Sequence, residues 1–397
     1  MDEQAIITRT PRQLRISTAI FFFISGFGYS SWASRIPTIQ HHLHLNEAQL
    51  GIVLFALPVG LMFTMPITNR LLSHYSSRSV ILIGSVLLNV ILVFIGLTNS
   101  MWQLIAMLFF FGAARNLMTL SINTQGVGVQ ALYNKSIMAM FHGLWSLAGF
   151  AGAAFGLVMV YFNIVPLWHF VIVSSVLTAV TLLFIKDTLY QEPIPQTKKR
   201  IFSLPDKYLL KFSLICFACM ACENTMYDWS AIYFQKVIHA EKAMATSAFV
   251  IYLVAMASGR FIGDKLINKA GIKTVLKFSG IFIFCGLLMA VTLPFFVTAA
   301  FGFILVGLGV SCIVPMVFSL AGRSTNMSSS TALASISTVG YLGFLLVPPF
   351  VGFIAQSAGL RWSFGIIAMF GALIVFLVSQ IAEGQPQNEP VILPDYE

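Results

Sequence analysis

Charged residues are scarce in this chain: Asp, Glu, Lys and Arg make up 9% of its 397 residues, whereas 58% are apolar. An average soluble domain is about a quarter charged and about half apolar. A water-soluble globule cannot hide so much apolar side chain, because polar groups must still cover its surface. The scarcity of charge excludes an ordinary soluble enzyme and a disordered chain, and it predicts a protein embedded in the lipid bilayer.

Several other features are rare or missing. The five cysteines are an odd number placed within apolar stretches, so no disulfide framework is expected. The sequence has no GxxxxGK[ST] loop for ATP and no convergent set of catalytic or metal-binding groups. We therefore expect no enzyme activity, no cofactor and no metal. We also expect no nucleic-acid partner, because the cations are scattered among short loops.

Long apolar runs are what the sequence does contain, and about 20 such residues suffice for a helix to cross a bilayer. Between charged residues and turn residues these runs predict twelve transmembrane helices and therefore an all-α membrane protein. The predicted spans are 14–40, 47–72, 78–98, 101–130, 134–162, 164–186, 207–238, 244–268, 272–295, 298–322, 328–357 and 360–383.

The longest polar stretch divides the predicted spans into six and six. We expect a first bundle over 1–186, a linker over 187–206, a second bundle over 207–383 and a disordered tail over 384–397. The two halves show a weak internal repeat: the second span corresponds to the eighth, and the glycine-rich fifth span corresponds to the eleventh. Two parallel six-helix repeats around a central site are a common design of secondary transporters.

The distribution of Lys and Arg predicts the orientation. With a cytoplasmic N-terminus, 18 cations fall on the inner side and four on the outer side (Arg35, Lys236, Lys242 and Arg361), while Arg115 lies within a span. This asymmetry fits the positive-inside rule. The net charge of +9 is thus a topology signal, and it predicts a multi-pass protein of a bacterial inner membrane with both termini in the cytoplasm.

The span count, the long basic central loop and the basic loops after the second and eighth spans resemble the major facilitator superfamily. The loop motif of that superfamily is degraded here to Asn69-Arg70 with Arg78, and to Gly259-Arg260 and Gly263-Asp264 with Lys269. The resemblance implies a gating role for Arg70, Arg78, Arg260, Asp264 and Lys269.

A narrower set of motifs resembles the YbjJ-like group, which neighbours the fucose permeases. The motifs are Trp32-Ala-Ser-Arg35-Ile-Pro37, Asn134-Lys135-Ser136 with His142-Gly143, Glu223 with Asp228-Trp229, and Gly340-Tyr341-Leu342-Gly343-Phe344 with Pro348-Pro349. This resemblance implies a sugar or a sugar derivative as substrate. It also implies that spans one, four, seven and ten line the central cavity.

Ionisable residues within the predicted spans are functional candidates, because an unpaired charge at mid-bilayer costs about 3 kcal/mol or more. Arg115 and Glu223 lie about halfway along spans four and seven, whereas His142 and Asp228 lie nearer the ends of theirs. Glu223 and Asp228 are candidates for proton coupling. Two interpretations of Arg115 and Glu223 remain open: they pair across the cavity, or they bind a proton and an anionic substrate.

Uncharged polar residues cluster on the same spans and suit a polyhydroxylated ligand, although such residues also bond between helices. Ser25, Tyr29 and Trp32 form one stripe of a helix. The full set of predicted substrate-binding residues is Ser25, Tyr29, Trp32, Arg115, Asn116, Thr119, Asn123, His142, Trp145, Asn224, Tyr227 and Tyr341.

The sequence thus predicts a monomeric secondary transporter that moves a small polar solute, a sugar or sugar derivative, by alternating access and with the proton gradient. The alternative prediction is a proton-driven exporter of drugs or metabolites, since the abundant Phe and Met residues suit an adaptable apolar pocket.

Overall fold

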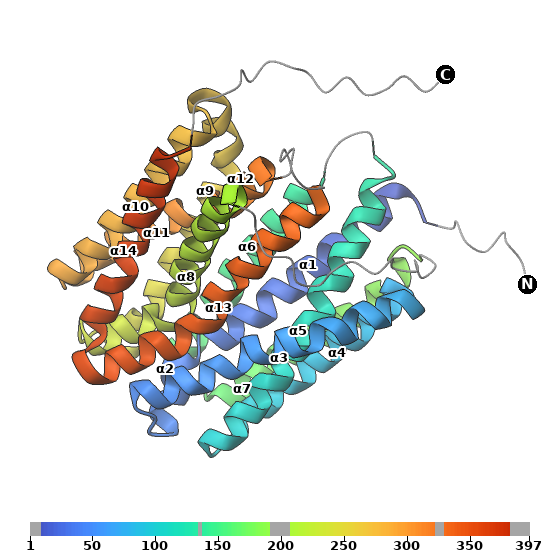
Figure 1. Cartoon of the computed structure of the whole chain (residues 1–397). Coiled ribbons are helices and arrows are strands. Elements are labelled where there is room, and N and C mark those ends of the chain that lie inside the picture. The colour runs from blue at the N-terminus through green and yellow to red at the C-terminus, as the bar shows by residue number, and fades with distance from the viewer. Residues whose placement is uncertain (1–8, 134–136, 191–206, 322–328, 382–397) are drawn as a thin grey trace, which may run out of the picture.

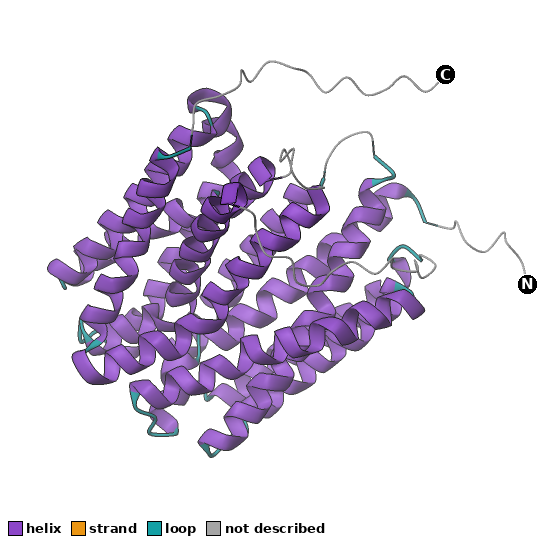
Figure 2. Ribbon diagram, in the orientation of Figure 1, coloured by secondary structure: helices purple, strands orange, loops and turns teal. Residues whose placement is uncertain are grey.

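The computed structural model describes residues 9–133, 137–190, 207–321 and 329–381. Within these ranges the regular structure is helical and contains no strand (Figure 2). The helices are α1 (Pro11–Ala33), α2 (Ile36–His42), α3 (Glu47–His74), α4 (Ser77–Ile95), α5 (Met101–Gln130), α6 (Met138–Tyr161), α7 (Pro166–Phe184), α8 (Lys207–Lys236), α9 (Lys242–Ala270), α10 (Ile272–Thr292), α11 (Phe296–Val310), α12 (Ile313–Ala321), α13 (Ser329–Ala358) and α14 (Leu360–Ser379), with a 3₁₀ turn at Ile185–Asp187.

Eleven segments in the described part are long and apolar enough to cross a membrane. α1, which is rich in Ser and Gly, is the remaining predicted span. Ten of the twelve predicted spans are continuous helices. The first is broken into α1 and α2, and the tenth into α11 and α12. Pro37 and Pro315 follow these breaks within the first turn of α2 and α12, where a missing N–H costs no helical hydrogen bond.

Local sequence signals account for several helix starts. Thr10 and Gln13 form a reciprocal capping box at the start of α1, and Asn46 and Gln49 do the same for α3. Each box satisfies two backbone groups that the first turn of a helix leaves without partners. At the C-terminal end of α9, Gly271 adopts a φ of 78° and ends the helix.

Glycines allow helices within each half to approach closely. α3 packs on α5, where an added Cβ on Gly60 would touch the carbonyl of Phe109 and one on Gly112 that of Leu57. α1 packs on α6 in a similar way, and α10 packs on both α11 and α14. We call α1–α7 the N-half and α8–α14 the C-half.

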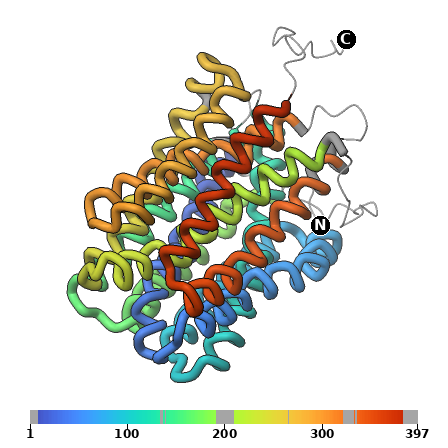
Figure 3. Tube along the Cα trace, turned by 60° about the vertical axis from the view of Figure 1, so that its left-hand side comes forward, coloured from blue at the N-terminus to red at the C-terminus, as the bar shows by residue number. Residues whose placement is uncertain are grey.

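The two halves meet along α3 with α13 and along α6 with α9. α3 and α13 run side by side in Figures 1 and 3. Gly51 and Gly352 bring the backbones of these two helices together. The Lys236 ammonium and the Glu47 carboxylate form an ion pair across the boundary.

α1 begins and α14 ends at the same end of the helix bundle in Figure 1, as an even number of spans requires. We call this the terminal end. The predicted linker lies outside the described residues from 191 to 206, and so does the predicted tail at 384–397. The boundaries of the two predicted bundles therefore stay a prediction.

Candidate functional site

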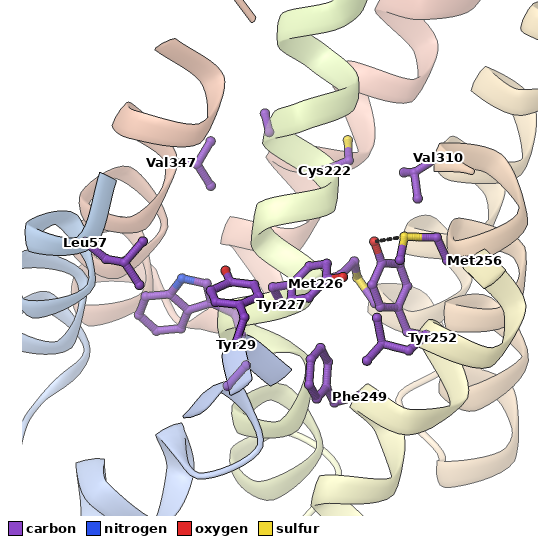
Figure 4. Packing of buried hydrophobic residues seen from close by; sticks show 14 of the residues in the cluster. Tyr29, Leu57, Cys222, Met226, Tyr227, Phe249, Tyr252, Met256, Val310 and Val347 are labelled. Atoms are coloured by element: carbon purple, nitrogen blue, oxygen red, sulfur yellow. Dashed lines mark hydrogen bonds between the residues drawn. The ribbon is translucent and has the colours of Figure 1, made fainter. Parts of the chain in front are cut away.

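A pair of tyrosines forms the centre of the boundary between the halves. Tyr29 of α1 and Tyr227 of α8 have ring centroids 5.4 Å apart, and both side chains are buried. Phe249 and Tyr252 of α9 continue the aromatic group, with centroids 5.3 and 6.0 Å from that of Tyr227 (Figure 4). Each half thus contributes an aromatic face at the same place.

Arg115 of α5 joins this aromatic group through its guanidinium. Its Cζ lies 3.8 Å from the ring centroid of Tyr29 and 5.7 Å from that of Phe344 in α13. A cation over an aromatic face is attracted by the electron density of the ring. Arg115 is therefore held by rings from both halves.

Glu223 of α8 pairs with Arg260, and not with Arg115. Its Oε1 lies 3.6 Å from a terminal nitrogen of Arg260. The same guanidinium donates to the Ser146 hydroxyl of α6 and, through Nε, to the Ser311 carbonyl at 3.4 Å. One side chain of α9 thus connects the candidate proton site to the opposite half.

The placement of Arg260 corrects the prediction that it lies in a gating loop. The side chain sits within α9, eleven residues before the C-cap Gly271. The apolar residues on both sides of it, Ala255 to Ala257 and Phe261 to Ile262, were the available signal.

Asp228 lies one helical turn after Asn224, and the amide of Asn224 donates to its Oδ2 at 3.1 Å. Both side chains are buried. Together, Tyr29, Arg115, Glu223, Asn224, Tyr227 and Asp228 occupy facing stretches of α1, α5 and α8. We call these six residues the central cluster.

Several buried polar atoms in this region have no hydrogen-bond partner. They are Ser25 Oγ and Ser30 Oγ of α1, one terminal nitrogen of Arg115, and Tyr227 Oη, Trp229 Nε1 and Ser230 Oγ of α8. Buried polar groups without partners are rare in folded proteins and call for an explanation. A ligand bound at this place would supply the partners of these atoms. Their concentration on three central helices favours this explanation.

Other predicted binding residues bond within their own half. The Asn116 amide oxygen accepts from Thr68 at 2.7 Å, and the Asn123 amide donates to the Thr119 carbonyl at 2.8 Å. These bonds match the alternative interpretation, in which polar side chains connect or stabilise helices. Trp32 is buried at 1% exposure and also packs inside the core.

The remaining predicted site residues lie beside the central cluster. His142 is exposed and contacts the Phe22 ring edge-on with centroids 5.4 Å apart. Trp145 is half-buried, and its carbonyl lies against Gly26 of α1. Tyr341 of α13 is 38% exposed. Within the part of the chain that the structure describes, none of the three forms a hydrogen bond or an ion pair with the central cluster.

The predicted gating residues have different surroundings. Arg70 and Lys269 are exposed at the ends of α3 and α9. Arg78 binds the hydroxyl and the carbonyl of Thr188 and lies over the Tyr190 ring, which fixes α4 to the segment after α7. The side chain of Asp264 falls outside the described residues.

Sequence reasoning missed a buried pair at the end opposite the termini. Arg35, expected in an outer loop, is only 2% exposed. Its Nε donates to His169 Nδ1 at 2.9 Å, and a terminal nitrogen donates to the Ile164 carbonyl at 2.8 Å. The short spacing between Arg35 and Pro37, which ties the arginine to a helix break, was the available signal.

A groove of about 960 Å³ lies away from the central cluster. It is lined at the end opposite the termini by residues that include Lys236, Glu47, Arg361 and Trp362. Its charged groups already have partners, since Lys236 pairs with Glu47 and Arg361 donates to the Val291 carbonyl, so the central cluster is the better candidate site. Among the described residues, no group of three His, Cys, Asp or Glu side chains is arranged to hold a metal ion.

Comparisons with known proteins agree with this architecture. A family model described as Major Facilitator Superfamily matches residues 18–333. An uncharacterized MFS-type transporter of Yersinia pestis is 32% identical over 355 residues, which cover 89% of this chain and 92% of that protein.

Two weaker similarities have more specific names. A Helicobacter pylori protein with the provisional name glucose/galactose transporter is 25% identical over 225 residues, which cover 55% of this chain and 53% of that protein. The crystal structure of the nucleoside transporter NupG matches with a TM-score of 0.75 at 14% identity, over 92% of this chain and 99% of that one. The structural match shows the shared fold alone.

Proposed function

We propose a substrate class and an energy source for this chain, which belongs to the major facilitator superfamily and is therefore a multi-pass membrane transporter and not an enzyme. The superfamily fold confirms the predicted all-α architecture of twelve spans. The proposed substrate is a small polar solute, a sugar or sugar derivative, moved by alternating access. The narrower resemblance to the YbjJ-like and fucose-permease-like group stays a prediction.

The observation that carries the substrate class is the mixture of aromatic faces and unpartnered polar atoms at the centre. The Tyr29 and Tyr227 rings offer flat apolar surfaces, and Ser25, Ser30 and Arg115 leave polar atoms without partners beside them. A sugar has an apolar ring face and many hydroxyls, so it satisfies both kinds of group. The provisional name of the Helicobacter pylori relative gives independent support to a sugar.

The proposed energy source is the proton gradient, with Glu223 as the proton acceptor. While Glu223 is ionised, its ion pair holds Arg260, whose other nitrogen bonds Ser146 of the opposite half. Protonation of Glu223 removes the negative charge and frees Arg260 to move. The protonation state of a C-half residue thereby changes a contact between the halves, which is what coupled alternating access requires.

We place the chain in a bacterial inner membrane as a monomer with the terminal end in the cytoplasm. The excess of Lys and Arg on the side of the terminal end persists when the buried Arg35 and the interior Arg260 are left out of the count. Arg70, Arg78 and Lys269 lie near the terminal end and stay proposed gate residues, together with Asp264 and the interior Arg260.

Proteoliposome uptake tests this proposal. Purified protein is offered a panel of labelled sugars and sugar derivatives, with and without an inward proton gradient. We expect saturable uptake of at least one member and accumulation only when the gradient is present. Uptake that is equal with and without the gradient would contradict proton coupling. Extrusion of dyes with no sugar transport would establish the exporter alternative instead.

A further inference from the structure

Arg115 is a cation packed between aromatic rings, with one terminal nitrogen that has no partner. Its guanidinium lies against Tyr29 at 3.8 Å, and Phe344 lies 5.7 Å away. A guanidinium has five N–H donors, all in its plane. When a ring covers its face, these donors point outward along the edge, where a planar anion binds. One terminal nitrogen of Arg115 is buried and has no partner.

The acidic residues nearby make their direct contacts with other groups. Glu223 pairs with Arg260, and Asp228 accepts from Asn224. Throughout the described ranges, no carboxylate oxygen lies within 4.0 Å of the Arg115 guanidinium. Taking a charge out of water without a direct partner is unfavourable. The substrate is the remaining source of an anionic partner.

Unpartnered hydroxyls next to Arg115 extend the same site. Ser30 Oγ and Tyr227 Oη lie 3.2 and 4.0 Å from the point where a Cβ on Gly149 of α6 would stand. Neither hydroxyl has a partner, and both side chains are buried. Because Tyr227 also packs on Tyr29, the hydroxyls and the guanidinium belong to one continuous surface. That surface combines the guanidinium of Arg115, the packed rings of Tyr29 and Tyr227, and two hydroxyls without partners.

We propose that the substrate is an acidic sugar whose carboxylate binds the edge of Arg115. This inference rests on the proposed function and adds the charge of the substrate. A carboxylate carries a single negative charge and two coplanar oxygens that match the guanidinium fork. A phosphate monoester carries nearly two charges at neutral pH, which one arginine balances poorly. Entry of the carboxylate with one proton is electroneutral.

The test measures binding separately from transport. Thermal stabilisation of purified protein is titrated with a sugar acid, the parent neutral sugar and the matching sugar phosphate. A ligand that binds only the native state stabilises it by an amount that grows with the ratio of its concentration to its Kd. We expect the sugar acid to act at a concentration at least about tenfold lower than the neutral sugar, in line with a charge-assisted bond. We expect the sugar phosphate to be weaker than the acid.

Substitutions assign the effect to Arg115. In Arg115→Gln the preference for the acid over the neutral sugar should disappear, while the neutral sugar still binds. Arg115→Lys keeps the charge but not the planar fork, so it should retain a smaller preference. Arg361→Gln is the matched control: Arg361 is exposed near the other groove and bonds the Val291 carbonyl, and its loss should leave the preference unchanged.

Each outcome decides between the proposals. A neutral sugar that binds as tightly as its acid, a tighter sugar phosphate, or an unchanged preference in Arg115→Gln overturns the inference about charge. If the acid stabilises the wild type but not Arg115→Gln, and yet no sugar is accumulated with a proton gradient, the proposed transport function fails and the anion site stands.

Discussion

Arg35 shows how one side chain can hold a loop of this transporter in place. Its bonds to His169 and to the Ile164 carbonyl connect the end of α1 to the turn between α6 and α7. Because His169 Nδ1 accepts from Arg35, the imidazole is neutral and carries its proton on Nε2. The pair is buried, so water cannot replace either partner without cost.

Arg35→Ala should therefore destabilise the protein by about 2 kcal/mol, because it deletes a charge-assisted bond and leaves a buried acceptor without a donor. The measurement is unfolding in a denaturing-detergent titration. Arg361→Ala, which removes an exposed arginine that also bonds a backbone carbonyl, serves as the control and should cost less than about 1 kcal/mol. Equal losses of unfolding free energy in the two variants would show that the burial of Arg35 contributes nothing to stability.

Glu223 provides the second prediction at this scale. Glu223→Gln keeps the size of the side chain but removes its ability to change charge. We expect accumulation to fall to the level reached without a gradient and to lose its dependence on pH, while exchange of substrate across the membrane persists. Glu241→Gln is the control, since Glu241 is exposed and makes no capping bond at the start of α9. A pH profile that survives in Glu223→Gln would remove the proton role.

The central cluster could be predicted only in part from residue types. An ionisable residue in an apolar run stands out, so Arg115, Glu223 and Asp228 were found from the sequence. Their partners were not found, because pairing depends on which helix faces which. Glu223 forms an ion pair with Arg260 of the neighbouring α9, and Asn116 accepts a hydrogen bond from Thr68. A polar side chain in a membrane helix looks the same in sequence whether it binds another helix or a ligand.

Helix boundaries were the more predictable feature. The span expected at 101–130 is α5 with the same limits, since Ser100 caps one end and polar residues follow the other. Breaks within a span were not predicted: Pro37 and Pro315, late in their predicted spans, lie in the first turn of α2 and α12, whereas Pro58 and Pro348 lie inside continuous helices. Neighbouring helices decide between these outcomes.

Close glycine packing of α3 on α5 leads to a prediction at the scale of elements. Gly112→Ala would place a methyl group against the Leu57 carbonyl, and a backbone atom cannot move aside cheaply. We expect a loss of about 1–3 kcal/mol in unfolding free energy. Gly365→Ala in α14, where nothing lies within 4 Å, should be neutral or stabilising. If both variants unfold like the wild type, the helices are not in the tight contact described here.

At the scale of the whole molecule, contact between the halves is what a transport cycle must break and remake. In the predicted repeat, α3 corresponds to α9 and α6 corresponds to α13. The contact between α3 and α13 is therefore the symmetric equivalent of the contact between α9 and α6. The Lys236–Glu47 ion pair joins the end of α8 to the start of α3, beside the α3–α13 boundary. The pair therefore stabilises closure at the end opposite the termini.

Charge reversal tests that role. Lys236→Glu replaces attraction by repulsion and should shift the population toward opening at that end. The shift should be no more than about fivefold, because a partly exposed ion pair contributes about 1 kcal/mol or less. Single-molecule distance measurements between the halves report the shift. Combining Lys236→Glu with Glu47→Lys should restore the original population, and failure to restore it would mean that the ion pair does not act on closure.

The contact of Tyr29 with Tyr227 has a mechanical consequence. In a rocking motion, displacement grows with distance from the axis, so groups near the axis shift little while the helix ends swing apart. The two rings, one on α1 and one on α8, lie in the interior of the boundary between the halves and therefore near the axis of such a motion. A substrate that separates the two rings would act close to the axis. A small change in the distance between the rings would then produce large displacements at the helix ends on both sides of the membrane.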